Sequence, residues 1–153
     1  MGCLFCDIAQ GRTPCNKIWE DEKHMAFLSI YPNTEGFTVV IPKKHFSSYV
    51  FAQDEQVIHE LMSATKKVAL LLDKVFEDVG RTGMFFEGYG VNHLHSKLFP
   101  MHGTGDISDF KAIDSSVKKY FDHYEGYISS HDYKRADEHK LNKLAKRILS
   151  LAE

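Results

Sequence analysis

Long apolar runs, a strong net charge and abundant cysteine are all missing from this sequence of 153 residues. Without an apolar stretch of membrane-spanning length, no membrane association is expected. The formal net charge is only −2. No global positive field can therefore hold the backbone of a long nucleic acid, and long DNA or RNA is not an expected partner.

The N-terminus lacks the basic region and the apolar core of a secretory signal, so a cytoplasmic location is expected. The chain has three cysteines, which in a reducing compartment are thiols or metal ligands rather than a disulfide framework. Internal repeats and low-complexity segments are absent. The length therefore predicts one domain, or one domain with a tail.

Short apolar stretches that are typical of β-strands occur along the first two thirds of the chain. Residues 37–41 are β-branched and apolar, which predicts a central strand covered on both faces. Residues 91–99 predict another strand, which Pro100 ends and which Gly88-Tyr89-Gly90 joins to the strand before it. The predicted strands are 17–20, 24–29, 37–41, 84–87 and 91–99.

Two helices are predicted as well. Residues 54–77 carry apolar side chains with a period of about 3.6, with Asp54 as a suitable N-cap and Gly80 just beyond the predicted end. A terminal helix begins after Asp137, a second suitable cap. Strands followed by one long helix, further strands and a terminal helix predict an α+β domain.

Three nitrogen bases alternate along the last predicted strand. Side chains two residues apart on a strand share a face, so His93, His95 and Lys97 would project together, about 6.5 to 7 Å apart. Burying such groups without partners is costly. The alternative is a solvated strand face that is polar without a function.

Further motifs accompany these bases in a fixed order, and together they decide between the two interpretations. They are Cys3-x-x-Cys6-Asp7-Ile8, Trp19-Glu20-Asp21-Glu22, Ala26-Phe27, the run from Gly36 to His45, and His93-x-His95-x-Lys97-x-x-Pro100. Over residues 3–102 the sequence resembles the histidine triad (HIT) superfamily, as a bacterial-type hydrolase with a variant His-x-His-x-Lys triad.

The resemblance implies a HIT-like α+β fold, in which an antiparallel meander sheet carries one long helix. Residues 1–102 would form the HIT domain, and residues 103–153 a C-terminal extension that ends in a helix. This extension would pack on the same domain or on a dimer partner. The resemblance also implies a homodimer, formed by joined sheets and by the helix over residues 54–77.

The activity implied is that of a nucleotidyl hydrolase, with a nucleotide or a dinucleoside polyphosphate as substrate. His95, the middle base, would attack the α-phosphate and form a nucleotidyl-histidine, from a ring expected to stand open to solvent. Lys97 would supply a cation to the phosphate, and His93 would complete the catalytic set. A phosphoanhydride or a phosphoramidate would be cleaved.

Cys3, Cys6, His45 and His93 form a second constellation. A Cys-x-x-Cys pair with two separate histidines is a sufficient ligand set for tetrahedral structural zinc. In the branch that contains galactose-1-phosphate uridylyltransferase, and in several bacterial members, similar positions bind zinc. The alternatives are a redox pair, or two idle thiols in a flexible N-terminus. Cys15, outside both motifs, is interpreted as a packing residue.

The sequence departs from the family at four places. Lys97 replaces the third histidine, Phe37 replaces a fourth active-site histidine, and Ser29 replaces an aspartate that holds the ribose in one branch. The segment 86–92 is shorter than the usual loop, although its glycines permit close approach to a phosphate. Lysine is a poor proton donor, which leaves the acceptor of the nucleotidyl group open.

The substrate pocket is therefore assigned from fewer donors than usual. Phe27 and Ile30 are predicted to contact the nucleobase of the substrate. The other predicted substrate contacts are Ser29, Gly88, Gly90, Asn92 and His102. Two compensations are hypothesised: His102 as the acid toward the leaving group, and the aromatic segment 120–133 with Arg135 folded over the groove. The rival functions are a nucleotidyltransferase of the uridylyltransferase kind and a nucleotide-binding regulatory protein with little turnover.

Overall fold

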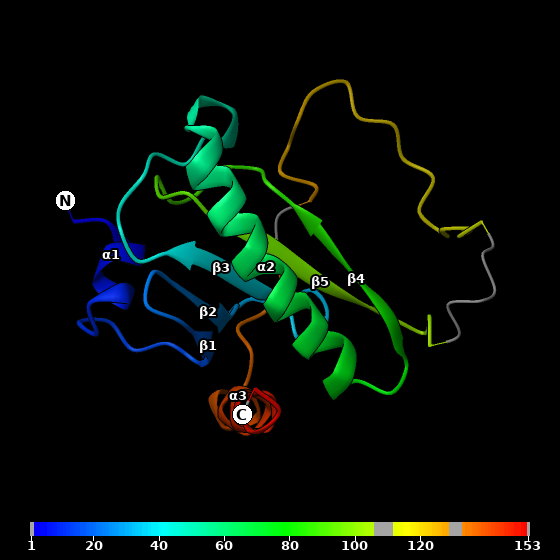
Figure 1. Ribbon diagram of the computed structural model, residues 1–153. Coiled ribbons are helices and arrows are strands. Elements are labelled where there is room, and N and C mark those ends of the chain that lie inside the picture. The colour runs from blue at the N-terminus through cyan, green and yellow to red at the C-terminus, as the bar shows by residue number, and fades with distance from the viewer. Residues whose placement is uncertain (1, 106–111, 129–132, 153) are drawn as a thin grey trace.

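The protein folds as a five-stranded antiparallel sheet with helices on both faces, seen in a computed structural model that describes residues 2–105, 112–128 and 133–152 (Figure 1). The α+β prediction is confirmed. The strands are β1 (Lys17–Glu20), β2 (His24–Leu28), β3 (Thr38–Pro42), β4 (Val79–Phe85) and β5 (Ser96–His102). The helices are α1 (Leu4–Ala9), α2 (Glu55–Val75) and α3 (Glu138–Ser150), with a 3-10 turn at Val50–Ala52.

The strand order is β1-β2-β3-β5-β4. The first three strands form a meander, and α2 then carries the chain across the sheet, so that β4 takes the far edge and β5 fills the gap beside β3. Within the described ranges, no helix is long and apolar enough to cross a membrane.

Strand β3 is buried along its whole length because both faces of the sheet are covered, as the sequence predicts. Val40 packs in the larger core under α2 and α3, whereas Val39 and Ile41 pack with Phe5 of α1 on the opposite face. Alternating side chains thus serve two cores. This arrangement places α1, and with it the Cys-x-x-Cys motif, against the face opposite to α2.

The ends of the helices follow the predicted caps only in part. At Asp137 the side chain accepts a hydrogen bond from the backbone N–H of Lys140, as expected of an N-cap. Asp54 precedes α2 with extended backbone angles, but its side chain makes no capping bond. Gly80 was expected directly beyond the end of this helix but does not terminate it, because α2 ends at Val75 with Phe76 as its C-cap residue and Gly80 lies inside β4.

Strand β4 begins earlier and strand β5 begins later than the sequence predicts. Strand β5 starts at Ser96, so His93 and His95 lie in the preceding loop, where the N–H of Leu94 donates to the Phe46 carbonyl instead of to a neighbouring strand. Strand β5 also continues through Pro100. Proline is tolerated there because β5 pairs with β3 only as far as Leu98, which leaves that side of Pro100 open.

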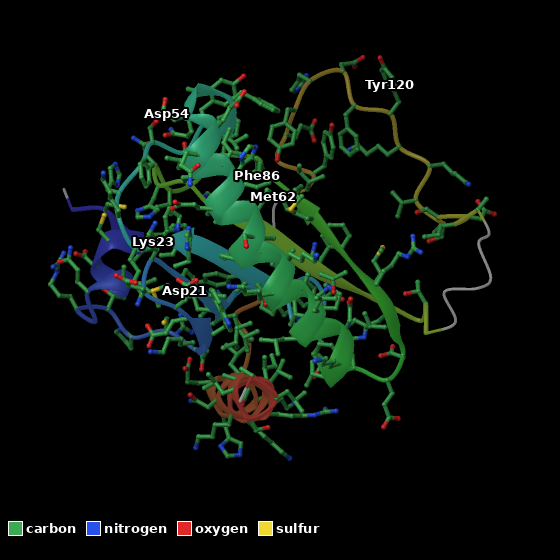
Figure 2. All side chains as sticks on the ribbon, viewed as in Figure 1. Asp21, Lys23, Asp54, Met62, Phe86 and Tyr120 are labelled. Atoms are coloured by element: carbon green, nitrogen blue, oxygen red, sulfur yellow. The ribbon has the colours of Figure 1, made fainter. Side chains whose placement is uncertain are left out.

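The C-terminal segment crosses from the sheet to α3. Leu141, Ala145 and Ile148 of α3 are buried in the larger core of the same chain. Residues 112–128, called the arm below, run outside the β4 edge, and Tyr120 stands far from the sheet with 87% of its surface exposed (Figure 2). A division of the chain after residue 102 stays a prediction, and residues 129–132 of the aromatic segment lie outside the described ranges.

Candidate functional site

A cavity of about 400 Å³ opens between α1, β2 and the loop that precedes β5. This volume lies within the range of small-molecule sites, roughly 300 to 1,000 Å³. Its walls are largely apolar, with Phe5 and Ile8 of α1 facing Leu28 and Val39 of the sheet. The predicted substrate and catalytic residues that line the cavity are Phe27, Ser29, Ile30, Gly90, His95 and Lys97.

Two other predicted contacts lie elsewhere. Gly88 adopts a left-handed φ of 76° and packs against Ser48, where an added Cβ would come within 3.1 Å of the Ser48 carbonyl oxygen. Asn92 accepts a hydrogen bond from the backbone N–H of Ser48, over 3.0 Å. Both residues thus shape the loop that carries His93 and His95 and do not line the cavity.

His102, predicted as an acid toward the leaving group, is not brought to the cavity. Its Nδ1 lies 3.1 Å from a carboxylate oxygen of Asp78, and its Nε2 lies 2.9 Å from the Glu35 carbonyl. Burial lowers the pKa of His102, but the Glu35 carbonyl and the Asp78 carboxylate outweigh it, and the pKa is raised overall. Because both nitrogens are engaged, His102 holds the C-terminal end of β5 to its neighbours.

Among the described residues, His95 forms a hydrogen bond through only one of its two ring nitrogens. Its Nδ1 lies 2.6 Å from the backbone carbonyl of His93, which can only accept, so Nδ1 carries the proton and the neutral ring leaves Nε2 with a lone pair. The expectation of a ring open to solvent is wrong: His95 is only 2% exposed and is reached through the cavity. Burial lowers its pKa to about 4, assisted by the charges of Lys97 and His93.

Lys97 lines the same cavity but is not a free cation. Its Nζ lies 3.6 Å from a carboxylate oxygen of Glu87, and the two side chains are only 6% and 3% exposed. The ammonium also lies over the ring of Phe85, 5.6 Å from the centroid. The other carboxylate oxygen of Glu87 accepts a hydrogen bond from the hydroxyl of Tyr124, which belongs to the arm.

The aromatic segment therefore reaches the edge of the site without entering it. The ring of Tyr124 lies 6.0 Å, centroid to centroid, from that of Tyr89, and Tyr89 lines the cavity. Among arm residues that the structure describes, none lines the cavity itself.

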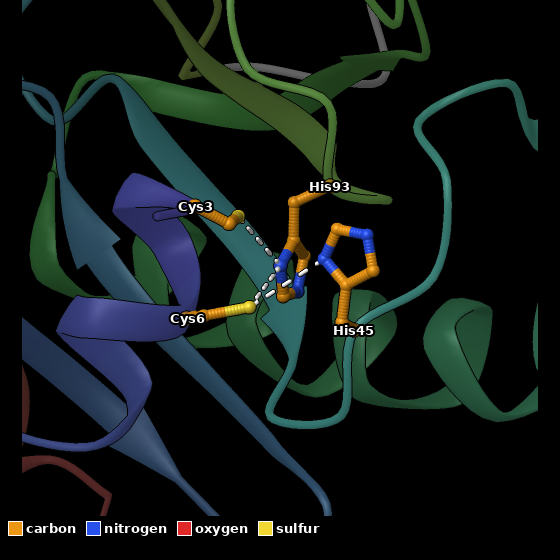
Figure 3. Close-up of side chains that lie close together, drawn as sticks. All are labelled: Cys3, Cys6, His45 and His93. Carbon is orange, nitrogen blue, oxygen red and sulfur yellow. Dashed lines mark hydrogen bonds between the residues drawn. The ribbon is translucent and has the colours of Figure 1, made fainter. Parts of the chain in front are cut away.

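The four predicted metal ligands lie close together, next to the loop that precedes β5 (Figure 3). Cys3 and Cys6 extend from the start of α1, His45 follows β3, and His93 precedes β5; their ligand atoms all lie within 4.8 Å of one another. The Cys-x-x-Cys segment is thus helical and not a flexible terminus, with Cys3 as the N-cap residue of α1.

The distances in this cluster fit a tetrahedral ion. The Nδ1 of His93 lies 3.4 Å from the Cys3 sulfur and 3.5 Å from the Cys6 sulfur. Zinc bonds of about 2.3 Å to sulfur and 2.0 to 2.1 Å to nitrogen give a tetrahedral S···N edge of roughly 3.5 Å. The Nε2 of His93 lies 2.8 Å from the Pro42 carbonyl and donates to it, so the lone pair of Nδ1 points at the sulfurs.

Burial changes the acid–base behaviour of the cluster. Burial lowers the pKa of His93, which favours the neutral imidazole that a metal requires. Burial and the neighbouring Cys3 raise the pKa of Cys6. A raised thiol pKa opposes a redox role, because the thiolate is the reactive form.

Sequence reasoning missed several residues that line the cavity or lie next to it. Glu87 had a usable signal, since a buried lysine requires an anionic partner and Glu87 is the nearest acid that precedes Lys97 in sequence. Tyr89 and the residues of α1 had none, because their part in the wall depends on how distant segments pack. Cys15, interpreted as a packing residue, also lines the cavity, and burial raises its pKa.

The chain is similar to known proteins over most of its length. A family model described as the HIT domain matches residues 10–104. The chain is 33% identical to the adenosine 5'-monophosphoramidase of Schizosaccharomyces pombe over 104 residues, which cover 65% of this chain and 74% of that protein.

Two solved structures show the same fold. A hypothetical histidine triad nucleotide-binding protein from Sulfolobus tokodaii superposes with a TM-score of 0.72 at 27% identity, covering 98% of this chain and 91% of that one. A Zn-bound histidine triad family protein from Mycobacterium smegmatis superposes with a TM-score of 0.69 at 20% identity, covering 99% and 95%.

Proposed function

The chain belongs to the histidine triad family, and from that premise we propose that it hydrolyses a phosphoanhydride or phosphoramidate bond of a nucleoside monophosphate through a nucleotidyl-histidine. The observation that carries the proposal is the state of His95. The carbonyl of His93 binds its Nδ1, so that a neutral Nε2 remains in a cavity shared with Lys97.

In the first step, Nε2 of His95 forms a bond to the α-phosphorus as the bond from phosphorus to the leaving group breaks. The leaving group departs with that electron pair and takes a proton from water. In the second step, water attacks phosphorus, the P–N bond breaks, and a nucleoside monophosphate leaves the restored imidazole. Lys97 stabilises the charge on the phosphoryl oxygens in both steps.

The apolar half of the cavity is the proposed base pocket. Phe27 and Ile30 would hold the base, and Ser29 and Gly90, which line the same cavity, would contact the sugar and phosphate. The resemblance to a protein named adenosine 5'-monophosphoramidase supports a nucleoside monophosphate as the transferred part. A dinucleoside polyphosphate is the other substrate class to be tested.

We further propose that Cys3, Cys6, His45 and His93 hold one structural zinc ion. Their spacing fits the ion, and a related fold is Zn-bound. Bound zinc would link the N-terminal helix to the loop before β5. His93 would then serve both centres, with its imidazole in the metal site and its carbonyl on His95.

A homodimer in the cytoplasm is proposed as the working form. Strand β4 is an edge strand of the sheet, and Met84 on it is 40% exposed. On the neighbouring α2, Met62 is 37% exposed. These apolar groups would be covered if two sheets joined at β4. Sedimentation of the purified chain tests the assembly.

Trapping of the intermediate tests the proposed reaction. Protein incubated with a nucleoside monophosphoramidate labelled on the phosphate should carry an acid-labile label, which peptide mapping assigns to His95. Addition of a sugar phosphate separates hydrolysis from transfer, since sugar nucleotide forms only in a transferase. Tight binding of AMP with neither label nor product would instead favour a regulatory protein.

A further inference from the structure

The carboxylate of Glu87 lies beside the cation on which the proposed reaction depends. The Glu87–Lys97 pair is buried, with an oxygen-to-nitrogen distance of 3.6 Å. In so dry a setting the two charges interact strongly and neither is screened by water. An incoming phosphate therefore meets a neutral pair instead of a free ammonium.

Glu87 is held in this position from its other side. The hydroxyl of Tyr124 donates to the carboxylate oxygen that is turned away from Lys97. Tyr124 in turn lies against Tyr89 at the cavity wall. Because both oxygens have partners, the carboxylate cannot simply rotate away when an anion enters.

Other positive charge is scarce in the cavity. Of its lining residues, as far as the chain is described, Lys97 is the sole lysine or arginine. A phosphoramidate or phosphodiester carries one negative charge at the reacting phosphorus. A polyphosphate leaving group adds several more, for which the described lining residues offer no second lysine or arginine.

Resting on the proposed function, we propose that Glu87 is a specificity-determining residue that selects against leaving groups with additional negative charge. Its carboxylate limits the anionic charge that the site accepts to about that of one phosphoryl group. Substrates with a neutral or cationic leaving group, such as an amine, are accepted, and substrates with a polyphosphate leaving group are disfavoured.

The test compares two substrates of the same nucleoside on the full-length protein. One is the phosphoramidate of a primary amine, and the other is the dinucleoside tetraphosphate. Glu87→Gln keeps the shape of the side chain and removes its charge. We expect its preference for the amidate to fall about tenfold, mainly through a lower KM for the tetraphosphate, as expected for the loss of one nearby repulsive charge.

Glu22→Gln is the matched control, because Glu22 is exposed and lies outside the cavity lining. It should leave the preference unchanged. Glu87→Asp retains the charge and should keep most of the preference of the unmodified protein for the amidate. A further readout is independent of turnover: Glu87→Gln should bind AMP, a dianion, more tightly than the unmodified protein does in calorimetry.

An equal loss of activity on both substrates in Glu87→Gln would overturn the proposal, because it would make Glu87 a mere support for Lys97. An unchanged preference would overturn it as well. If the variant does not fold, a series of leaving groups with zero to three negative charges on the unmodified protein decides: a flat series contradicts the proposal. The proposed reaction itself fails separately, if His95 carries no label.

Discussion

One histidine lies directly before strand β5 and another is its last residue, and the fold uses the two differently. At the N-terminal end, the described hydrogen bonds of the fold use only the Nδ1 of His95, and its Nε2 is left for the cavity that it lines with Lys97. At the C-terminal end, His102 engages both nitrogens, one with Asp78 and one with the Glu35 carbonyl. Both residues are histidines, so the difference between them lies in how many ring nitrogens are left without a hydrogen bond to the described residues: one in His95 and none in His102.

The largest expected effect separates these two histidines. His95→Asn removes the proposed nucleophile and should lower kcat at least 1,000-fold, the order of magnitude expected when a covalent nucleophile is lost. His102→Gln should leave kcat within about twofold, since position 102 does not line the cavity. Turnover of a nucleoside phosphoramidate measures both. Comparable losses in the two variants would erase the contrast between the ends of β5.

The N-terminal end should also depend on the metal cluster, whereas the C-terminal end should not. Cys6→Ser removes one ligand, and we expect bound zinc to fall from about one ion per chain to a small fraction, with Tm lower by roughly 5 to 10 °C. Cys15→Ser is the control, because Cys15 lies outside the cluster. Metal analysis and calorimetry measure both quantities. Retention of zinc and Tm in Cys6→Ser would contradict the structural role.

Much of this arrangement was predictable from the sequence. The continuous apolar run over residues 37–41 predicted a strand covered on both faces, and the 3.6 period predicted α2 to within two residues at each end. The Cys-x-x-Cys pair with His45 and His93 predicted the four members of the cluster. Such features are local in sequence, or carry ligand types that few other functions require.

What escaped prediction depends on contacts between distant segments. A strand pattern over residues 91–99 is the simplest interpretation of alternating apolar and polar residues, yet Leu94 bonds to Phe46 and the strand begins only at Ser96. Likewise, nothing near His102 in sequence announces Asp78 or Glu35. Whether a histidine keeps a free nitrogen is decided by these tertiary partners.

A buried pair of hydroxyl groups at the N-terminal end of β5 allows the two ends to be compared by their contribution to stability. The Oγ atoms of Thr65 and Ser96 lie 2.8 Å apart, and Thr65 donates to the Leu61 carbonyl, so Ser96 donates to Thr65. Thr65→Val leaves the Ser96 hydroxyl without its partner and should lower the free energy of unfolding by about 1 to 3 kcal/mol.

The matched control is Thr82→Val on β4. Thr82 donates to Asp73 over 2.7 Å at a partly buried position, where water can replace the lost bond. Its effect should be about 1 kcal/mol or less. Urea unfolding of both variants gives the two values. A larger loss for Thr82→Val would show that the bond between β4 and α2 contributes more to stability than the buried hydroxyl pair at the start of β5.

The smallest effect is a pH dependence confined to the C-terminal end. The Asp78 carboxylate and the Glu35 carbonyl raise the pKa of His102 above its ordinary value of 6.5, against the opposing effect of burial. The folded protein then binds more protons than the unfolded chain between 6.5 and the raised value, so this contribution to stability is complete below pH 6.5 and is lost as pH rises. The hydrogen bond from His102 lowers the pKa of Asp78, so on the acid side the contribution is lost only as pH falls through that lowered value.

The Tm difference between the unmodified protein and His102→Gln should therefore be larger at pH 6 than at pH 8, by about 2 °C or less for such a partly exposed pair. Titration of the metal cluster is common to both proteins and cancels in the difference. A Tm difference that grew toward pH 8 would mean that the ring at position 102 is held neutral, and that the two ends of β5 are more alike than their hydrogen bonds indicate.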